Sequence, residues 1–284
     1  PNPYLRVFPI KEVSDIGRKH NIPLIMDNTA SPVICKPIEH GAAVVVHSLT
    51  KYIGGHGTVI GGCLVDGGNF DWTADKKRQP LFNEPDASYG GAVWGEVVPQ
   101  LTGANVAFAV RARVVLLRDL GAPLAPDNAW NTIQGLETLP LRMKQHCSNA
   151  EKVVAFLQTH KNVDRVIYPT LHEGEIAARS KKYFKGGNGA LVGIEVKGGV
   201  EAGKKFIESL KMFYHVANIG DARSLAIHPA TTTHSQLTEE ELIAAGVTPG
   251  YVRLSIGIEH SDDIIADLDQ ALTASGKPSL KAVS

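Results

Sequence analysis

Two segments decide the fold class of this chain, Pro23-Leu24-Ile25-Met26-Asp27-Asn28-Thr29 and Ala42-Ala43-Val44-Val45-Val46-His47-Ser48. Each starts with a run of apolar residues and ends in polar side chains. Continuous apolar strands that alternate with helices are typical of a parallel sheet buried on both faces. In such sheets ligands bind beyond the carboxyl ends of the strands. The sequence therefore predicts a ligand site where Asp27 meets the segment His47-Ser48-Leu49-Thr50-Lys51.

The pattern of apolar residues predicts the other elements. A helix is expected at 9–20, a third strand at 61–65, an irregular excursion at 70–103, a helix at 105–120 that ends at Gly121, and one long or broken helix at 127–160. The remainder mixes strands at 190–196 and 252–256 with helices at 203–211, 239–245 and 262–272. This second part has an α+β pattern.

The length of the chain favours two domains, with one large α/β domain as the alternative. At 284 residues it exceeds the usual size of a single domain. We place the junction near the start of the long helix, which gives an α/β domain over residues 1–125 and an α+β domain over residues 126–284.

Composition narrows the class of partner. The chain has 29 basic and 29 acidic residues, so its formal charge is zero, and it contains no apolar run of about 20 residues. We therefore expect no nucleic-acid partner, no membrane partner and a small-molecule substrate. The three cysteines are widely spaced and form no Cys-x-x-Cys pair, which argues against a disulfide framework or a zinc site and fits the cytoplasm.

Asp27 and Lys51 could serve a pyridoxal-phosphate (PLP) cofactor. Such a cofactor needs an amine to bind covalently, an acid to keep its pyridine nitrogen protonated, and hydroxyl groups such as those of Ser48 and Thr50 for its phosphate. The alternative is that Asp27 and Lys51 form a surface ion pair while the hydroxyls satisfy backbone groups at the strand ends. Metal binding is not expected, and we assign His47, His56, His228 and His234 to ordering loops and strand ends.

The wider sequence resembles the cystathionine γ-synthase-like Cys/Met metabolism family. The resemblance is carried by Asp27-Asn28-Thr29, His47 to His56, Gln134-Gly135-Leu136-Glu137-Thr138-Leu139, Arg142-Met143, Gly220 to Leu225, His228-Pro229-Ala230, Thr232-Thr233-His234 and Val252 to Glu259. It covers nearly the whole chain. It implies the aspartate-aminotransferase-like fold, PLP fold type I, with a large domain built on a parallel-rich sheet and a smaller α+β C-terminal domain.

The resemblance also implies roles for single residues. Lys51 corresponds to the Schiff-base lysine, Asp27 to the partner of the pyridinium, and Ser48 and Thr50 to the phosphate-binding hydroxyls. Arg253 corresponds to the arginine that holds the substrate carboxylate, a role that suits its planar fork. Asn218 stands where related lyases commonly have a serine beside that carboxylate.

Asparagine at position 218 resembles the O-acetylhomoserine sulfhydrylase branch of the family. That branch implies a γ-replacement in methionine biosynthesis, in which O-acetylhomoserine and sulfide give homocysteine and acetate. Gly90 and Gly91 depart from it, since such enzymes usually have a histidine after the tyrosine that corresponds to Tyr89. Methionine γ-lyase, cystathionine γ-synthase and a γ-replacement with another nucleophile therefore remain alternatives.

Members of this family carry further elements upstream: a phosphate loop, an aromatic ring that stacks on the cofactor, and a Tyr/Arg pair that reaches the neighbouring subunit. We find none of these in the sequence. We therefore expect a missing N-terminal part, and expect residues 1–284 alone not to form an active monomer. The active species would be a homo-oligomer, a tetramer built as a dimer of dimers. The alternative to an enzyme is an inactive fragment or an assembly subunit.

Overall fold

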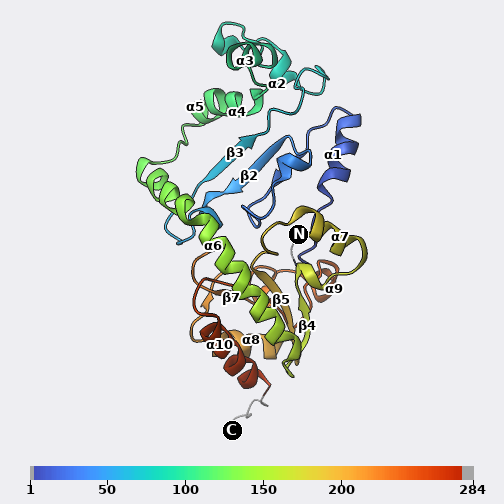
Figure 1. The fold of residues 1–284 in the computed structure, drawn as a ribbon, viewed down its shortest axis with the longest axis vertical. Coiled ribbons are helices and arrows are strands. Elements are labelled where there is room, and N and C mark those ends of the chain that lie inside the picture. Colours follow the sequence, from blue (N-terminus) through green and yellow to red (C-terminus); the bar gives the residue numbers. More distant parts are fainter. Residues whose placement is uncertain (1–2, 277–284) are drawn as a thin grey trace.

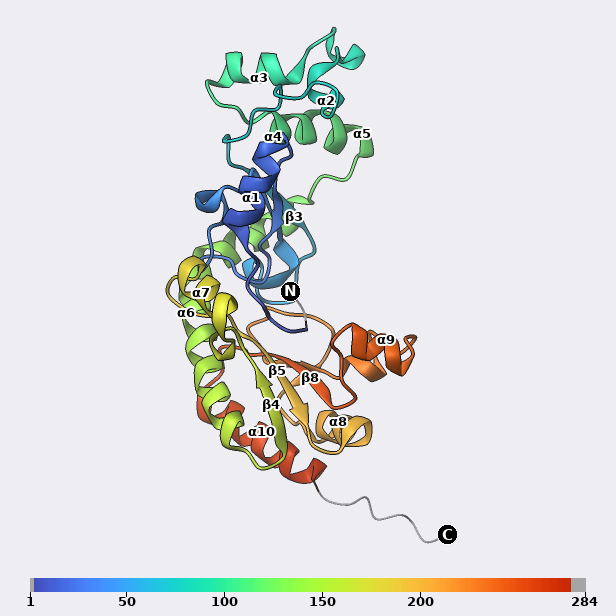
Figure 2. The ribbon, with the colours of Figure 1, turned by 90° about the vertical axis from the view of Figure 1, so that its right-hand side faces the viewer.

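The computed structural model describes residues 3–276. The molecule is elongated, and a three-stranded sheet in its upper half is connected to a five-stranded sheet in its lower half by one long helix, α6 (Figure 1). Turning the molecule by 90° shows the same two levels, with helices above the smaller sheet (Figure 2). Within residues 3–276, no helix is long and apolar enough to cross a membrane.

The upper sheet contains β1 (Ile25–Asp27), β2 (Val44–Ser48) and β3 (Gly62–Asp66), in that order. β1 and β2 are parallel, as expected, whereas β3 runs antiparallel to β2. The smaller sheet is therefore mixed. A parallel third strand would need a crossover helix, but the connection at 49–61 contains only the π-helical turn η2 (Leu49–Ile53). Ahead of β1 lies the expected helix α1 (Ile10–Lys19), and a single 3-10 turn, η1 (Pro37–His40), lies between β1 and β2.

Helices above this sheet fill the region predicted to be irregular. They are α2 (Pro80–Asn83), the 3-10 turn η3 (Ala87–Tyr89) and α3 (Trp94–Thr102). Trp72 and Trp94 are buried among them in an aromatic cluster. Gly90 and Gly91 both have positive φ, of 63° and 84°, in the turn that follows Tyr89, a conformation that glycine adopts without steric cost.

The predicted helix at 105–120 is also present. It consists of α4 (Ala107–Arg111), the π-helical segment η4 (Ala112–Leu117) and α5 (Arg118–Leu120), and it ends at Gly121 with φ of 65°.

The long helix α6 (Pro126–Thr159) holds the two levels together. Pro126 stands in its first turn, where the missing N–H costs nothing. Near its middle, His146 Nδ1 bonds to the Ile256 carbonyl at 2.7 Å, and Asn149 Nδ2 donates to the carbonyl of Gly257 at 3.1 Å. These contacts tie α6 to the segment that follows the strand β8 (Tyr251–Ser255).

The lower sheet has five strands in the order β4-β5-β8-β7-β6. The strands are β4 (Val163–Ile167), β5 (Leu191–Val196), β6 (Tyr214–His215), β7 (Leu225–Ile227) and β8, and among them only β6 and β7 pair in parallel. The helices of this half are α7 (Gly174–Tyr183), α8 (Gly199–Ser209), α9 (Glu239–Ala244) and α10 (Ser261–Ser275), with 3-10 turns η5 (Pro169–Leu171) and η6 (Pro229–Thr231).

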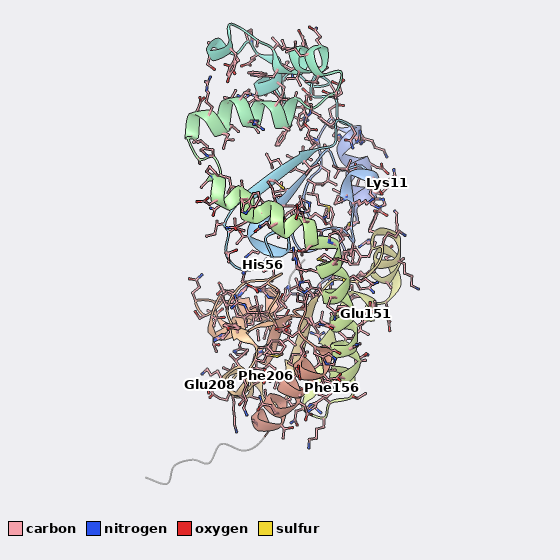
Figure 3. The ribbon with its side chains drawn as sticks, turned by 60° about the vertical axis from the view of Figure 1, so that its left-hand side comes forward. Lys11, His56, Glu151, Phe156, Phe206 and Glu208 are labelled. Atoms are coloured by element: carbon pink, nitrogen blue, oxygen red, sulfur yellow. The ribbon has the colours of Figure 1, made fainter. Side chains whose placement is uncertain are left out.

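The main hydrophobic core lies between this sheet and its helices. Phe206 of α8 is fully buried in it, and Phe156 of α6 packs against the same cluster (Figure 3). Tyr52, the residue after Lys51, is also fully buried in this core. The turn that contains Lys51 is therefore anchored in the lower half of the molecule although it follows a strand of the upper sheet.

Candidate active site

Lys51 lies in η2, directly after β2. The turn is irregular, because Lys51 has φ of −94° and ψ of −132° and interrupts the helical geometry around it. Its ammonium group donates a hydrogen bond to the side-chain oxygen of Asn218. Two residues far apart in the sequence are thus brought together at the boundary between the two sheets.

Arg253 completes this cluster from β8. Its Nη2 donates to the backbone carbonyl of Asn218 at 3.4 Å, a long contact that places the guanidinium beside the same residue. Burial lowers the pKa of Lys51, and the positive charge of Arg253 lowers it further. The pKa of Arg253 is also lowered by burial. Lys51 therefore holds a larger share of neutral amine near neutral pH than an exposed lysine does.

The loop that carries Asn218 is fixed on both sides. The Gly220 N–H donates to the Ser255 hydroxyl at 3.0 Å, and the Ala222 N–H donates to the Gly55 carbonyl at 2.8 Å. Gly220 has φ of 72° and lies so close to Tyr52 that a Cβ would come within 2.6 Å of its backbone nitrogen. Asn218 is thereby held against the turn that contains Lys51.

Asp27 ends β1 and is exposed to solvent. Its Oδ1 accepts a hydrogen bond from the Thr29 N–H at 2.8 Å, and the Thr29 hydroxyl accepts one from the Ser48 N–H at 2.8 Å. Thr29 therefore connects the carboxyl ends of the two parallel strands. Because Asp27 pairs with Val46, the side chains of Asp27, Val46 and Ser48 lie on one face of the sheet.

The hydroxyls of Ser48 and Thr50 differ in their partners. The Ser48 hydroxyl makes no hydrogen bond within residues 3–276. The Thr50 hydroxyl accepts from the Gly61 N–H at 3.2 Å, and its proton points toward the Gly61 carbonyl at 3.5 Å, beyond the usual range for such a bond. Both hydroxyls therefore retain a proton that could be donated to an anion.

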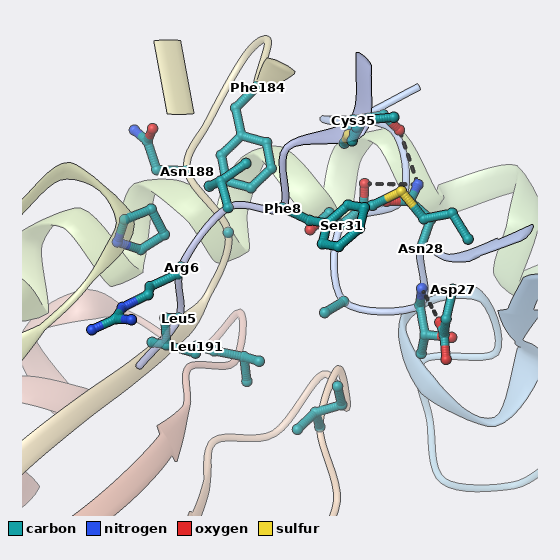
Figure 4. Close-up of a pocket in the computed structure, with 18 of the residues that line it drawn as sticks. Leu5, Arg6, Phe8, Asp27, Asn28, Ser31, Cys35, Phe184, Asn188 and Leu191 are labelled. Atoms are coloured by element: carbon teal, nitrogen blue, oxygen red, sulfur yellow. Dashed lines mark hydrogen bonds between the residues drawn. The ribbon is translucent and has the colours of Figure 1, made fainter. Parts of the chain in front are cut away.

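A cavity of about 530 Å³ lies next to Asp27. Figure 4 shows Asp27, Asn28 and Ser31 on one side of it, and Arg6, Leu191 and Asn188 on the other. Lys51, Asn218 and Arg253 are not part of its lining, but Ile219 is, so the cavity borders the lysine cluster. Arg253 instead lines a separate cavity of about 230 Å³, together with Thr233 and His234.

The donor set fits a phosphorylated pyridine aldehyde. It offers a partly desolvated amine, a carboxylate with a free oxygen and two hydroxyls with free protons. By contrast, no group of three or more His, Cys, Asp or Glu side chains that could hold a metal ion occurs in the part of the chain that the structure describes. Asp27, Ser48, Thr50 and Lys51 are the residues that could hold such a cofactor.

Two contributors could not be found from the sequence pattern. Thr29 follows Asp27 in the quoted segment, but its bond to Ser48 depends on the parallel pairing of β1 and β2. Arg142 stands in the family-like segment without an assigned role, and in the structure it contacts the carbonyls of Tyr52 and Ile53. Neither contact has a signal in the linear sequence.

Several known proteins are similar to this chain in sequence or in structure. O-acetyl-L-homoserine sulfhydrylase of Leptospira meyeri is 53% identical over 276 residues, which are 95% of this chain and 62% of that protein. A crystal structure of a putative O-acetylhomoserine (thiol)-lyase from Campylobacter jejuni, with N'-pyridoxyl-lysine-5'-monophosphate, matches with a TM-score of 0.86 at 43% identity, covering 96% of this chain and 64% of that one. Cystathionine γ-synthase from Xanthomonas oryzae pv. oryzae, in complex with aminoacrylate and cysteine, matches with a TM-score of 0.74 at 32% identity, covering 96% of this chain and 61% of that one.

The fold class predicted from the resemblance is thereby confirmed, and the chain spans about 62% of the length of the curated relatives it matches. The model of the family described as Cys/Met metabolism PLP-dependent enzyme matches residues 1–273. This chain belongs to the Cys/Met metabolism family of PLP-dependent enzymes.

Proposed function

We propose that the protein catalyses a PLP-dependent γ-replacement, converting O-acetylhomoserine and sulfide to homocysteine and acetate. The observation that carries the proposal is the cluster of Lys51, Asn218 and Arg253 at the boundary of the Asp27 cavity. Its combination of an amine, an amide and a guanidinium suits an α-amino acid, whose carboxylate needs a cationic partner. The 53% identity to an O-acetyl-L-homoserine sulfhydrylase supports this choice of substrate.

In the proposed site each residue has one task. With the cofactor bound, the negative charge of Asp27 would keep the pyridine nitrogen protonated, and the hydroxyls of Ser48 and Thr50 would donate to the phosphate. Arg253 binds the substrate carboxylate through its fork and fixes the orientation of Cα relative to Lys51. When bound, PLP supplies a carbonyl that captures the substrate amine and a ring that withdraws electrons from Cα.

Lys51 then moves the protons. Its pKa is lowered by burial and by Arg253, which increases the share of neutral amine and suits a base that removes a proton from Cα and later delivers it. γ-Replacement requires that protons also leave and return at Cβ, and the same amine can serve both carbons. The Cγ–O bond breaks as acetate leaves, and a sulfide sulfur forms the new bond to Cγ.

The identity of the nucleophile is tested by a product assay on the full natural chain. O-Acetylhomoserine is supplied with sulfide, with cysteine or with no nucleophile, and homocysteine, cystathionine and 2-oxobutyrate are measured. Homocysteine should dominate when sulfide is present. If 2-oxobutyrate is released faster than homocysteine under that condition, the protein is a lyase, and if cystathionine forms faster with cysteine than homocysteine with sulfide, it is a cystathionine γ-synthase.

We further propose that the chain divides into residues 1–125 and 126–284, with α6 opening the second domain. Separate sheets support this division, and so does a hydrophobic cluster formed wholly by residues of the first part. The main core belongs mostly to the second part, and the first part adds Ile34, Leu49, Tyr52 and Ile53 to it. We also propose a cytoplasmic homotetramer. Exposed apolar side chains on the first half of α6 support the assembly, among them Trp130 at 62%, Ile133 at 52% and Leu136 at 51%. Light scattering on the full natural chain would measure its mass, and a monomer would refute the assembly.

A further inference from the structure

Arg142 is a buried cation on α6 without an acidic partner. It is only 6% exposed, and no ion pair of its guanidinium occurs within residues 3–276. Burying a charge without compensation is unfavourable, and the pKa of Arg142 is lowered for this reason. A buried Arg142 therefore needs neutral acceptors for the hydrogen bonds of its N–H groups.

Those donors are all directed at two short segments. Nη1 donates to the Tyr52 carbonyl at 2.7 Å, and Nη2 donates to the Ile53 carbonyl at 3.1 Å. Nη2 also donates to the Gly135 carbonyl at 2.6 Å, and Nε donates to the Thr138 hydroxyl at 3.0 Å. The guanidinium thus donates to two groups of its own helix and to the carbonyls of the two residues directly after Lys51.

Other carbonyls of this turn have partners of their own. The Lys51 carbonyl accepts from the Gly55 N–H, the Gly54 carbonyl lies 2.7 Å from His56 Nδ1, and the Gly55 carbonyl accepts from the Ala222 N–H. Because the helical turn ends at Ile53, the carbonyls of Tyr52 and Ile53 have no later backbone N–H as partner. Within the described chain Arg142 is their donor, and a buried carbonyl without a donor is costly.

Two glycines make the contact possible. A Cβ on Gly135 would lie 2.3 Å from the Ile53 carbonyl oxygen, and a Cβ on Gly55 would lie 2.2 Å from Arg142 Nη1. A methyl group on Gly135 would push α6 and the turn apart, and one on Gly55 would displace the guanidinium. The helix, the guanidinium and the turn can therefore approach this closely because each of the two segments has a glycine at the contact.

We propose that Arg142 is a positioning residue, which holds the backbone after Lys51 so that the lysine Nζ stays within hydrogen-bond reach of Asn218. It does not touch the reacting atoms. The backbone at Lys51 departs from helical geometry, so regular helical hydrogen bonds alone do not fix the conformation of the turn. Among the described residues, the charge that acts on the Lys51 ammonium is that of Arg253, so Arg142 acts through geometry.

This role of Arg142 rests on the proposed role of Lys51 in the reaction. Its test therefore avoids turnover. The full natural chain, freed of cofactor, is labelled with trace acetic anhydride at a series of pH values, and the acetylation of Lys51 is followed by mass spectrometry. The midpoint of the curve reports the pKa of Lys51 in the folded protein.

Three variants are compared with the wild type. Arg142→Met removes all the donors, Arg142→Lys keeps the charge but loses the fork, and Leu157→Ala serves as the matched control. Leu157 is fully buried on the same helix in the same core, so its truncation destabilises the fold without removing a hydrogen bond from the turn. Circular dichroism at each pH confirms that the labelled protein is folded.

Loss of the fork should release the turn and expose Lys51 to water, which then replaces Asn218 as the acceptor for the ammonium while the effect of burial, the largest cause of the lowered pKa, is relieved. The midpoint should then rise toward the ordinary lysine value by about half a pH unit or more, which leaves about threefold less neutral amine at neutral pH. We expect this in Arg142→Met and, to a smaller extent, in Arg142→Lys, with no change in Leu157→Ala. Folded Arg142 variants with the wild-type midpoint, or an equal rise in Leu157→Ala, would overturn the proposal. Neither result depends on which nucleophile the enzyme uses.

Discussion

The ammonium of Lys51 donates a hydrogen bond to the side-chain oxygen of Asn218, 167 residues further along the chain. This bond joins the turn after β2 to the loop before β7, and so connects the two halves of the molecule at the proposed site. A bond of this kind favours the charged form of the lysine, whereas burial and Arg253 favour the neutral form. The balance of these effects sets how much free amine is present.

Replacing Asn218 should shift the equilibrium between the charged and the neutral form of Lys51. In Asn218→Leu the ammonium loses its acceptor while burial and Arg253 remain, so the pKa of Lys51 should fall further below its ordinary value. Competitive acetylation across a pH series measures this pKa directly. The direction is opposite to that expected for the Arg142 variants, which expose the lysine. A rise in Asn218→Leu would show that the side chain does not accept from Lys51.

Changing Arg253 to lysine should act mainly on substrate binding. An ammonium group cannot form the two parallel bonds that a guanidinium makes with a carboxylate, and loss of one charge-assisted bond costs about 1.5–3 kcal/mol. KM for O-acetylhomoserine should therefore rise about tenfold or more, while kcat changes less. Steady-state kinetics on the full natural chain provides both values. Arg165→Lys, on an exposed pair with Glu195, is the control and should leave KM unchanged.

A large fall in kcat at unchanged KM in Arg253→Lys would contradict the assignment of Arg253 to the carboxylate. It would indicate instead that the guanidinium positions Asn218, whose backbone carbonyl accepts a hydrogen bond from Arg253 Nη2. The two results are distinguishable in one experiment.

His146 should make the stability depend on pH. It is fully buried, and burial lowers its pKa from 6.5 to about 4. The unfolded chain binds a proton at this histidine below pH 6.5, whereas the folded protein does not until about pH 4. The contribution of neutral His146 is thus complete above pH 6.5 and is lost as the pH falls toward 4, by about 3 kcal/mol in total.

Urea denaturation at pH 7.5 and at pH 5 tests this effect. Burial also lowers the pKa of His40, His47 and His228, so all four histidines act in the same direction. The relevant quantity is the difference between wild type and His146→Asn, whose amide can still donate to the Ile256 carbonyl. The variant should lose less stability than wild type between the two pH values, and an equal loss would show that His146 titrates normally. Exposed His20→Asn should behave like wild type.

Much of this arrangement could be predicted because it depends on local patterns. The apolar runs that became β1 and β2, and the polar residues after them, show directly in the sequence, as does the pattern of apolar residues that predicts α6. The direction of β3 could not be predicted, since an apolar run does not record which way its partner runs. α3 was missed because glycine and proline interrupt its segment, although Trp94 and Val98 bury one face of it.

The residues of the candidate site also divide into those that the sequence could predict and those that it could not. Asp27, Ser48, Thr50 and Lys51 could be proposed from position at strand ends together with family resemblance. Asn218 and Arg253 came from the resemblance alone, because no spacing in the sequence predicts that β8 and the loop before β7 meet at Lys51. Arg142 required the structure, since its importance rests on which carbonyls its guanidinium reaches.

The role of Lys51 as the residue that carries the cofactor can be tested by fixing the attachment chemically. The full natural chain, loaded with PLP, is reduced with borohydride and digested, and the modified peptide is sequenced by mass spectrometry. We expect the pyridoxyl group on Lys51 alone, and expect Lys51→Ala to lose the modification, the visible absorbance and turnover, while the control Lys152→Ala keeps all three. A pyridoxyl group on a different lysine, or unchanged turnover in Lys51→Ala, would show that Lys51 does not carry the cofactor.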